Sequence, residues 1–270
     1  MATLRTALVT GASAGIGREI VRQLVQDRGM TVLATARRLD RLEDLAADLP
    51  PGKVIPCAGD LADPGFREQL WSRAEGLEGG LDLLVNNAGF GEYHDFAEQD
   101  IETIRDIFEI NVMALMDLTQ RAIRHMRPRG SGQILQISSN LGFVGLPYSS
   151  AYVATKHAVN GLVKSLRYEL QGTGVRIWAA CPGRTVSEFS RVAMGDGGVK
   201  GPLPSGARTD RVARAIVRGI DGRKTFLLTN FLAWAPVAFA KILPGPFDLI
   251  MTRWAPKHFR AEIDRARFGG

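Results

Sequence analysis

The sequence predicts an α/β fold in which a doubly wound parallel β-sheet carries helices on both faces. The first observation behind this prediction is that short apolar runs alternate with longer amphipathic stretches along most of the chain. The second is that these runs are apolar at nearly every position, as expected of strands that helices cover on both sides. Such an alternation implies parallel strands joined by right-handed crossovers. The expected strands lie at residues 6–10, 30–35, 53–57, 81–85, 132–138 and 175–181.

The stretches between the strands show the spacing and the end signals of helices. Residues 15–29 carry an apolar stripe, and Gly29 is placed to end this helix. The next-but-one helix follows Asp63, a candidate N-cap. A long helix is expected to start near Asp100 and to end before Pro128, because proline disfavours the helical conformation in the residue before it. Further helices are expected at 40–50 and 151–171.

Composition places the chain among globular proteins with a single domain, residues 1–270. Of these 270 residues, 45% are hydrophobic and 23% are charged, and the sequence has neither internal repeats nor low-complexity linkers. The net charge of +6 comes from basic residues dispersed among acidic ones, so nothing points to nucleic-acid binding. Cys57 and Cys181 form neither a disulfide framework nor a metal-ligand spacing, and the histidines are scattered, so no metal site is expected.

The N-terminal residues give an expectation about the compartment. They lead directly into the first strand, without the charged leader and apolar run of a secretory signal. Two reduced, buried cysteines would fit a reducing environment. We therefore expect a cytoplasmic protein.

The C-terminal part of the chain differs from the rest. Residues 187–210 are rich in glycine and proline, and we expect a loop that forms a lid over the substrate. Residues 225–270 form an apolar C-terminal extension, but Lys241 and four prolines interrupt it before the roughly 20 apolar residues of a membrane span are reached. The extension either packs on its own domain or on a partner subunit, or it makes a peripheral contact with a membrane.

The turn after the first strand has the pattern of a dinucleotide-binding site. In LVTGASAGIGREI, three glycines follow a strand directly and open an amphipathic helix. Glycine lets backbone N–H groups approach a diphosphate at the helix N-terminus, where the helix dipole favours negative charge. This strand–turn–helix context indicates a Rossmann fold with a bound dinucleotide. The expected contacts are Gly11, Ser13, Gly15, Ile16 and Gly17.

The end of the second strand indicates which dinucleotide binds. An acidic residue there would accept hydrogen bonds from a ribose 2′-hydroxyl, but Ala36 takes its place and Arg37 and Arg38 follow. A guanidinium pairs well with a phosphate. We therefore expect NADP(H) rather than NAD(H), with Arg37 on the 2′-phosphate. Arg38 either assists it or faces solvent at the start of the next helix.

A tyrosine and a lysine stand four residues apart in SSAYVATKHAVNGL. On a helix, Tyr152 and Lys156 would share one face, directed toward the carboxyl ends of the strands, where such folds bind ligands. A free phenol has a pKa of about 10, and a nearby ammonium would lower it. The pair would then give a proton to a carbonyl oxygen or take one from an alcohol. Taken alone, however, the two residues fit an ordinary surface helix better.

Several motifs accompany this pair in a fixed order. They are TGASAGIG, NNAG at 86–89, Asn111, Ser139, YVATK and CPG at 181–183. With these motifs, the sequence from residue 5 to about 190 resembles the short-chain dehydrogenase/reductase family. Residues 190–270 resemble it weakly, and in this family that part of the chain varies and sets the choice of substrate.

The resemblance implies roles for individual side chains. Tyr152 would be the general acid–base, and Lys156 would hold the nicotinamide ribose and lower the pKa of the tyrosine. Ser139, with Ser138 as the alternative, would hydrogen-bond the substrate oxygen. Asn111 would anchor a water that relays protons to the lysine.

The same resemblance implies the remaining cofactor contacts. Asp60 and Leu61 would flank the adenine, unless Asp60 only forms a turn. The sequence departs from the family pattern after its PG, where Thr185 and Ser187 take the places of a β-branched residue and a threonine. Arg184 beside them either makes a surface ion pair or favours an acidic substrate group. The other expected contacts are Asn87, Ala88, Gly89, Pro182, Gly183, Thr185 and Ser187.

The implied function is that of an NADP(H)-dependent oxidoreductase, which transfers a hydride between the nicotinamide and a ketone, an aldehyde or a secondary alcohol. Leu141, Phe143, Leu146 and the apolar extension predict a hydrophobic pocket and hence an apolar substrate. Two alternatives stay open: a dehydrogenase of lipid-type or steroid-type alcohols at a membrane surface, and a non-catalytic regulator that senses NADP(H). Family members usually pair through their long helices, which implies a homodimer or homotetramer.

Overall fold

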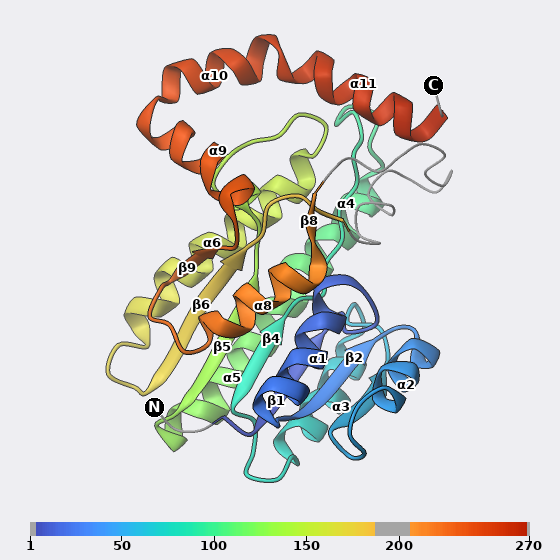
Figure 1. The fold of residues 1–270 in the computed structure, drawn as a ribbon, viewed down its shortest axis with the longest axis vertical. Coiled ribbons are helices and arrows are strands. Elements are labelled where there is room, and N and C mark those ends of the chain that lie inside the picture. The colour runs from blue at the N-terminus through green and yellow to red at the C-terminus, as the bar shows by residue number, and fades with distance from the viewer. Residues whose placement is uncertain (1–3, 187–205, 269–270) are drawn as a thin grey trace.

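The protein is built on a seven-stranded parallel sheet with the order β3-β2-β1-β4-β5-β6-β9 (Figure 1). The structure is a computed structural model, and it describes residues 4–186 and 206–268. The strand order confirms the predicted doubly wound α/β (Rossmann) fold. The order reverses between β1 and β4, and such folds bind ligands outside the carboxyl ends of these strands. The strands are β1 (Thr6–Thr10), β2 (Thr31–Ala36), β3 (Val54–Ala58), β4 (Leu83–Asn86), β5 (Gly132–Ile137), β6 (Val175–Cys181) and β9 (Phe226–Leu228).

The predicted strands all exist, and their ends lie within two residues of the expected ones. The edge strand β9 was missed, because three residues are too few to show a pattern of their own. It pairs in parallel with β6 and widens the sheet into the part of the chain that was expected to be an extension. A small second sheet joins β7 (Thr185–Val186) to β8 (Ala207–Arg208).

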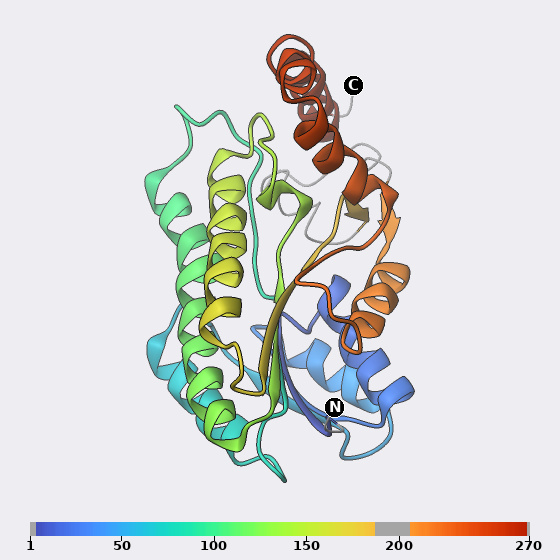
Figure 2. The same ribbon diagram turned by 90° about the vertical axis from the view of Figure 1, so that its left-hand side faces the viewer.

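Helices cover both faces of the sheet (Figure 2). One face carries α1 (Gly15–Arg28), α2 (Leu39–Ala47) and α8 (Thr209–Gly219), which bury one apolar core against the strands. The other face carries a second core. Its elements are α3 (Pro64–Glu75), α4 (Ile101–Phe108), the π-helix η1 (Glu109–Ala114), α5 (Leu115–Arg129) and α6 (Ser150–Glu169).

The helix ends that the sequence assigned to a named residue lie at that residue, with one exception. Gly29 takes the left-handed conformation (φ 63°) that ends α1, and the Asp63 carboxylate accepts a hydrogen bond from the Gly65 N–H at the start of α3. The predicted end before Pro128 is wrong, because α5 continues to Arg129 and ends at Gly130 (φ 63°). A proline in the last turn is tolerated here, and the left-handed glycine provides the stop.

The long helix expected from Asp100 is divided by a change in its winding. It begins at α4, where the Asp100 carboxylate caps the Thr103 N–H, and it passes through the wider π-helix η1 before α5. Asn111 lies inside this π-helical segment. Segments of this kind are often found at functional sites, and no sequence periodicity distinguishes six such residues from an ordinary helix.

The chain ends in a C-terminal arm, residues 231–268, which arches beyond the carboxyl ends of the strands (Figures 1 and 2). Among the helices that the structure describes, none is both long and apolar enough to cross a membrane. The arm consists of α9 (Phe231–Ile242), α10 (Pro244–Arg253) and α11 (Ala255–Phe268).

Candidate active site

A cavity of about 970 Å³ opens at the carboxyl ends of the strands, where this type of sheet is expected to bind ligands. Nearly all of the predicted site residues that the structure describes line it. Gly17 and Asn111 are exceptions, because they lie behind its wall. Ser187 falls outside the described residues, as does most of the expected lid at 187–210. The predicted residues on the wall are Gly11, Ser13, Gly15, Ile16, Arg37, Arg38, Asp60, Leu61, Asn87, Ala88, Gly89, Ser138, Ser139, Tyr152, Lys156, Pro182, Gly183 and Thr185.

The glycine turn after β1 packs tightly against the end of β4. Gly11 is left-handed (φ 66°), and a Cβ on it would lie 2.8 Å from Asn87 Nδ2. Gly17 packs against the same amide and against the Gly11 carbonyl, so a side chain there would collide with both. Asn87 Nδ2 donates hydrogen bonds to the carbonyls of Thr10 (2.9 Å) and Gly11 (3.2 Å). The turn is therefore fixed in place, and it presents backbone atoms to the cavity.

The N-terminus of α1 faces this turn without a side-chain cap. Ala14 stands at the N-cap and has no oxygen to accept from the first backbone N–H groups. An anion in the cavity would find these N–H groups and the positive end of the helix dipole. The turn therefore fits the diphosphate of a dinucleotide.

Two arginines follow β2 at the edge of the cavity. Arg37 and Arg38 are both exposed, and both line the cavity. Arg38 donates a hydrogen bond to Ser13 Oγ at 3.2 Å, which ties it to the glycine turn. Ala36 supplies no carboxylate at the end of β2. This edge therefore suits a ribose that carries a phosphate better than one with a free 2′-hydroxyl.

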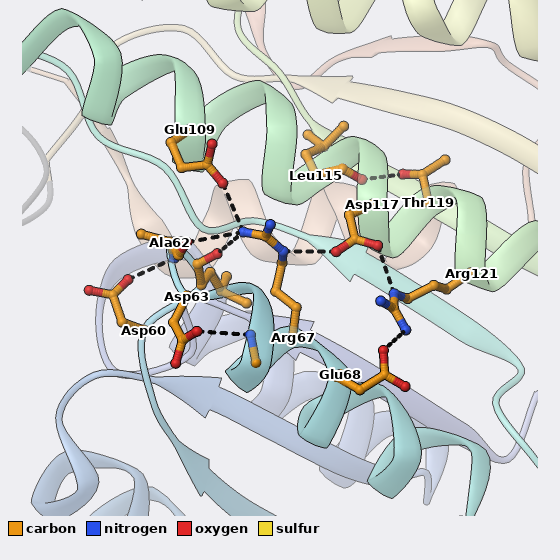
Figure 3. Close-up of polar contacts among 12 residues, drawn as sticks. Asp60, Ala62, Asp63, Arg67, Glu68, Glu109, Leu115, Asp117, Thr119 and Arg121 are labelled. Atoms are coloured by element: carbon orange, nitrogen blue, oxygen red, sulfur yellow. Dashed lines mark hydrogen bonds and ion pairs between the residues drawn. The ribbon is translucent and has the colours of Figure 1, made fainter.

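The loop after β3 forms the next part of the wall. Asp60 Oδ1 accepts a hydrogen bond from the Ala62 N–H at 2.9 Å, so it closes an Asx turn as well as lining the cavity. Arg67 supports this loop from behind, because its Nη1 donates to the Leu61 carbonyl at 2.6 Å. The expected adenine-binding loop is thus held in position from α3 (Figure 3).

Arg67 also connects this loop to the helix that carries Asn111 (Figure 3). Its guanidinium is buried and pairs with Glu109 in η1 and with Asp117 in α5, each at 2.8 Å. Burial of the Asp117 carboxyl opposes its ionisation, but hydrogen bonds from Arg121 and Arg67 lower its pKa overall. Sequence reasoning missed this network, since its members come from separate helices and form no motif.

Tyr152 and Ser139 meet on the cavity wall. Tyr152 lies in the first turn of α6, and its phenol lies close enough to Ser139 for the serine to act on the pKa of the phenol. Ser138 instead donates from Oγ to Asn160 Oδ1 at 2.7 Å, so Ser139 is the serine that the structure brings to the phenol. Gly91 packs on the tyrosine ring, and a Cβ there would lie 2.7 Å from the ring atom Cδ2. The ring is therefore held in one position.

Lys156 lies one turn further along α6, on the face expected for it. The side chain is buried, and its Nζ donates to the Ile137 carbonyl at 3.0 Å. The same nitrogen is 5.4 Å from the centroid of the Tyr152 ring. The lysine thus spans from α6 to the carboxyl end of β5, beside the phenol.

Burial controls the protonation of both side chains. It raises the pKa of the Tyr152 phenol above its ordinary value, with a further contribution from Tyr93, while the hydrogen bond with Ser139 opposes the change. It lowers the pKa of Lys156 to about 8. The predicted lowering of the tyrosine pKa by the lysine is therefore wrong in this structure, since removal from water disfavours the charged form of each group.

Asn111 joins three parts of the site from its place in the π-helix. Its Nδ2 donates to the Phe90 carbonyl (2.8 Å) and to Thr155 Oγ1 (3.1 Å), and its Oδ1 accepts from the Phe90 N–H (3.0 Å). Gly89 must stay small, because a Cβ would lie 2.8 Å from this Oδ1. The asparagine thereby fixes the stretch after β4 against the helix that carries Lys156. The water relay that the resemblance implies stays a prediction.

The C-terminal arm forms one wall of the cavity, so the extension does cover the pocket. Leu141 and Leu146 line the same cavity, as predicted, and the wall is apolar toward this end. Phe143 was also expected there, but its ring meets the Phe226 ring edge-on, with the centroids 5.2 Å apart. The residues that the arm contributes are Pro236, Phe247, Met251, Trp254, Ala255 and Phe259.

Some cavity residues had no motif that could have identified them. Tyr93 lines the cavity from the irregular stretch after β4, and it influences the Tyr152 phenol. Arg184, for which the sequence left a surface ion pair and a contact with the substrate open, is exposed and also lines the cavity. In the described part of the chain, no group of histidine, cysteine, aspartate and glutamate side chains is arranged to hold a metal ion.

Comparison with known proteins agrees with this geometry. A family described as short chain dehydrogenase matches residues 5–194. The chain belongs to this family. The ketoacyl reductase HetN of Nostoc sp. is 34% identical to it over 261 residues, which cover 93% of this chain and 89% of that protein. An uncharacterized oxidoreductase of Myxococcus xanthus is 33% identical and covers 92% of this chain and 97% of its own length. The chain is thus an oxidoreductase of the short-chain dehydrogenase family.

Solved structures of the short-chain dehydrogenase family share the fold over nearly the whole chain. A short-chain dehydrogenase from Sphingobium yanoikuyae, in complex with NADPH, superimposes with a TM-score of 0.78 at 29% identity and covers 93% of this chain and 96% of its own. An alcohol dehydrogenase from Thermococcus sibiricus, complexed with 5-hydroxy-NADP, superimposes with a TM-score of 0.72 at 28% identity, covering 83% and 95%.

Proposed function

We propose that this short-chain dehydrogenase uses NADP(H) to reduce the carbonyl group of an apolar ketone or aldehyde, and to oxidise the corresponding alcohol in reverse. The observation that carries the proposal is that Tyr152, Ser139 and Lys156 line one cavity together with the glycine turn. The complexes of two structural relatives with NADPH and with an NADP derivative support the choice of cofactor.

The residues of this chain fit that cofactor. The glycine turn and the uncapped N-terminus of α1 would hold the diphosphate, and Arg37 would face the 2′-phosphate with Arg38 beside it. The loop that contains Asp60 would flank the adenine, and Lys156 would hold the nicotinamide ribose. When bound, the nicotinamide supplies the hydride or accepts it.

Tyr152 is the group that exchanges the proton with the substrate oxygen. Because burial raises its pKa, the phenol stays protonated at neutral pH, which suits donation to a carbonyl oxygen. Ser139 would polarise the same oxygen through its hydroxyl. Oxidation of the alcohol would need the same group as phenolate, which then accepts the proton.

The substrate end of the cavity favours an apolar molecule. The arm contributes aromatic and aliphatic side chains to this end, including Phe247, Met251 and Phe259, and they face Leu141 and Leu146 across the same cavity. Transfer of an apolar group from water into such a site is worth about 25 cal/mol per Å² of buried surface. A bulky apolar ketone is therefore the substrate class that the cavity supports.

The decisive experiment replaces the phenol hydroxyl and leaves the ring. Tyr152→Phe should lower the rate of NADPH-dependent ketone reduction by about 10²–10⁴-fold, because it removes the proton donor. Binding of NADPH, followed by fluorescence titration, should change little. Wild-type protein titrated with NADPH and NADH, then tested against a panel of ketones by absorbance at the nicotinamide band, provides the reference. Turnover within tenfold of wild type in the variant would rule out the acid–base role.

A non-catalytic sensor of NADP(H) is the competing function, and it would bind NADPH yet reduce none of the ketones in the panel. A homodimer or homotetramer formed through the long helices at 100–127 and 151–171 is supported by exposed apolar side chains on the first of them, Ile101 and Phe108 in α4 and Met113 in η1. Light scattering coupled to gel filtration tests it.

A further inference from the structure

The outer side of α9 is apolar although it faces solvent. The side chains of Phe231, Trp234 and Ile242 are 72%, 50% and 73% exposed. Their spacing places them along one stripe of the helix. Ala233 and Val237 lie on the other side of α9 and are buried against the domain. The exposed stripe is thus turned away from the core.

The helix α10, which follows α9 directly, also carries exposed apolar side chains. None of its ten residues, all of which the structure describes, is buried. Leu249 and Ile250 are half exposed, as is Leu243 in the junction with α9. We call these six side chains the apolar face of the arm: Phe231, Trp234, Ile242, Leu243, Leu249 and Ile250.

Basic residues accompany the apolar face. From residue 231 to residue 268 the arm contains six basic side chains and three acidic ones, which are Asp248, Glu262 and Asp264. Four of the basic residues are described as exposed, namely Lys241, Arg253, Lys257 and Arg260, and Arg260 pairs with Asp264. The arm therefore combines exposed tryptophan and aliphatic side chains with positive charge.

The position of the arm relates this surface to the cavity. The arm forms one extreme end of the molecule, beyond the carboxyl ends of the strands (Figures 1 and 2). The same helices that carry the apolar face also line the cavity, through Pro236 on α9 and through Phe247 and Met251 on α10. A partner molecule or surface that covers the apolar face would thus lie next to the substrate end of the cavity.

We infer that the arm docks on the surface of a lipid bilayer that contains anionic headgroups. Tryptophan and aliphatic side chains enter the boundary between headgroups and acyl chains, while lysine and arginine bind anionic headgroups. A second copy of this chain is a poorer occupant, because a symmetric contact would bring two positively charged arms together. If the proposed function holds, docking lets an apolar ketone pass from the bilayer toward the cavity.

Flotation with vesicles tests the docking itself. Full-length protein should float with vesicles of phosphatidylcholine and phosphatidylglycerol in about a three-to-one ratio, and much less with phosphatidylcholine alone. The double variant Trp234→Ser, Leu249→Ser should bind the anionic vesicles at least about tenfold more weakly, because both side chains would leave the acyl boundary. Tyr168→Ser, which removes an exposed aromatic ring from α6, is the matched control and should float like the wild type.

A charge-reversal pair tests the headgroup contribution. Arg253→Glu with Lys257→Glu should abolish the preference for anionic vesicles, whereas Lys164→Glu with Arg167→Glu on α6 should leave it unchanged. Equal flotation of wild type and of the Trp234→Ser, Leu249→Ser variant would overturn the proposal. So would a fall in oligomer size for that variant, in the absence of vesicles, without loss of flotation.

These outcomes are separate from those of the proposed function. Neither Trp234 nor Leu249 lines the cavity, so turnover of a water-soluble ketone should be unchanged in the double variant. Failure to float with normal ketone reduction removes the docking and keeps the enzyme. Flotation without any ketone reduction removes the proposed enzyme and keeps the docking.

Discussion

The cofactor end of the cavity and the C-terminal arm belong to one site but differ in how tightly they are packed. At the cofactor end, Gly11 and Gly17 leave no room beside Asn87, and the buried Arg67 ties the adenine loop to two helices. In the arm, α10 lies over the cavity without a single buried residue in its described ten. Close packing therefore holds the residues of the cofactor end in place, whereas the helix α10, which forms part of the substrate wall, is packed only loosely against the domain. Changes at the first end should therefore affect stability and cofactor binding, and changes in the arm should affect substrate binding and docking on vesicles but not cofactor binding.

The strongest test of this contrast is Arg67→Met. The change leaves Glu109 and Asp117 without their shared buried partner, and we expect the free energy of unfolding to fall by about 2–3 kcal/mol. This value is below that for a fully buried pair, because both carboxylates are partly exposed. Urea denaturation measures it, and the KM for NADPH should rise as the loop loses its support.

Arg121→Met is the matched control on the same network. Arg121 pairs with Asp117 and with the exposed Glu68, so its loss should cost about 1 kcal/mol or less. Equal losses of stability for the two variants would contradict the special role of the buried guanidinium.

The second test changes the choice of nucleotide. Arg37→Asp should lower kcat/KM with NADPH by about 10–100-fold, because a charge-assisted contact to the 2′-phosphate is replaced by repulsion. Activity with NADH should be retained or improved, since a carboxylate can accept from a ribose 2′-hydroxyl. An unchanged ratio of NADPH to NADH activity would remove Arg37 from the cofactor site.

The third test addresses the arm. Phe247→Ala should raise the KM for a bulky apolar ketone by up to about tenfold, because the ring belongs to the cavity wall. The KM for NADPH should stay the same. Leu249→Ala, on the same helix but outside the cavity, serves as the control and should change neither constant. A rise in the KM for NADPH with Phe247→Ala would show that the two regions are less independent than their packing indicates.

The smallest expected effect is a pH dependence. Burial lowers the pKa of Lys156 to about 8, so its ammonium is present below that pH and is lost above it. The raised pKa of Tyr152 keeps the phenol protonated throughout. We expect kcat/KM for ketone reduction to halve near pH 8 and to decline further above it. In the variant Lys156→Arg, kcat/KM should no longer decline above pH 8, whatever its absolute value. A kcat/KM of the wild type that stays constant up to pH 10 would contradict the role of the charged lysine.

Local patterns were sufficient to predict much of the fold and of the site. The strands β1 to β6 were predictable because an apolar run with turn signals at its ends is a local feature. The positions of Gly11, Tyr152 and Lys156 were predictable for the same reason, since a turn or one helical face brings such residues together. The π-helix around Asn111 was not predictable, because the periodicity of six residues does not differ recognisably from that of an ordinary helix.

Local patterns in the sequence were enough to predict the parallel α/β architecture, the grouping of Ser139, Tyr152 and Lys156, and the end of the sheet at which they meet. The fold was needed to show that burial raises the pKa of the tyrosine, and that the arm both lines the cavity and presents an apolar face to solvent. The two kinds of feature differ in the distance along the chain over which they act. Periodicity and turn chemistry act over a few residues, whereas desolvation and packing depend on segments that are far apart in the chain.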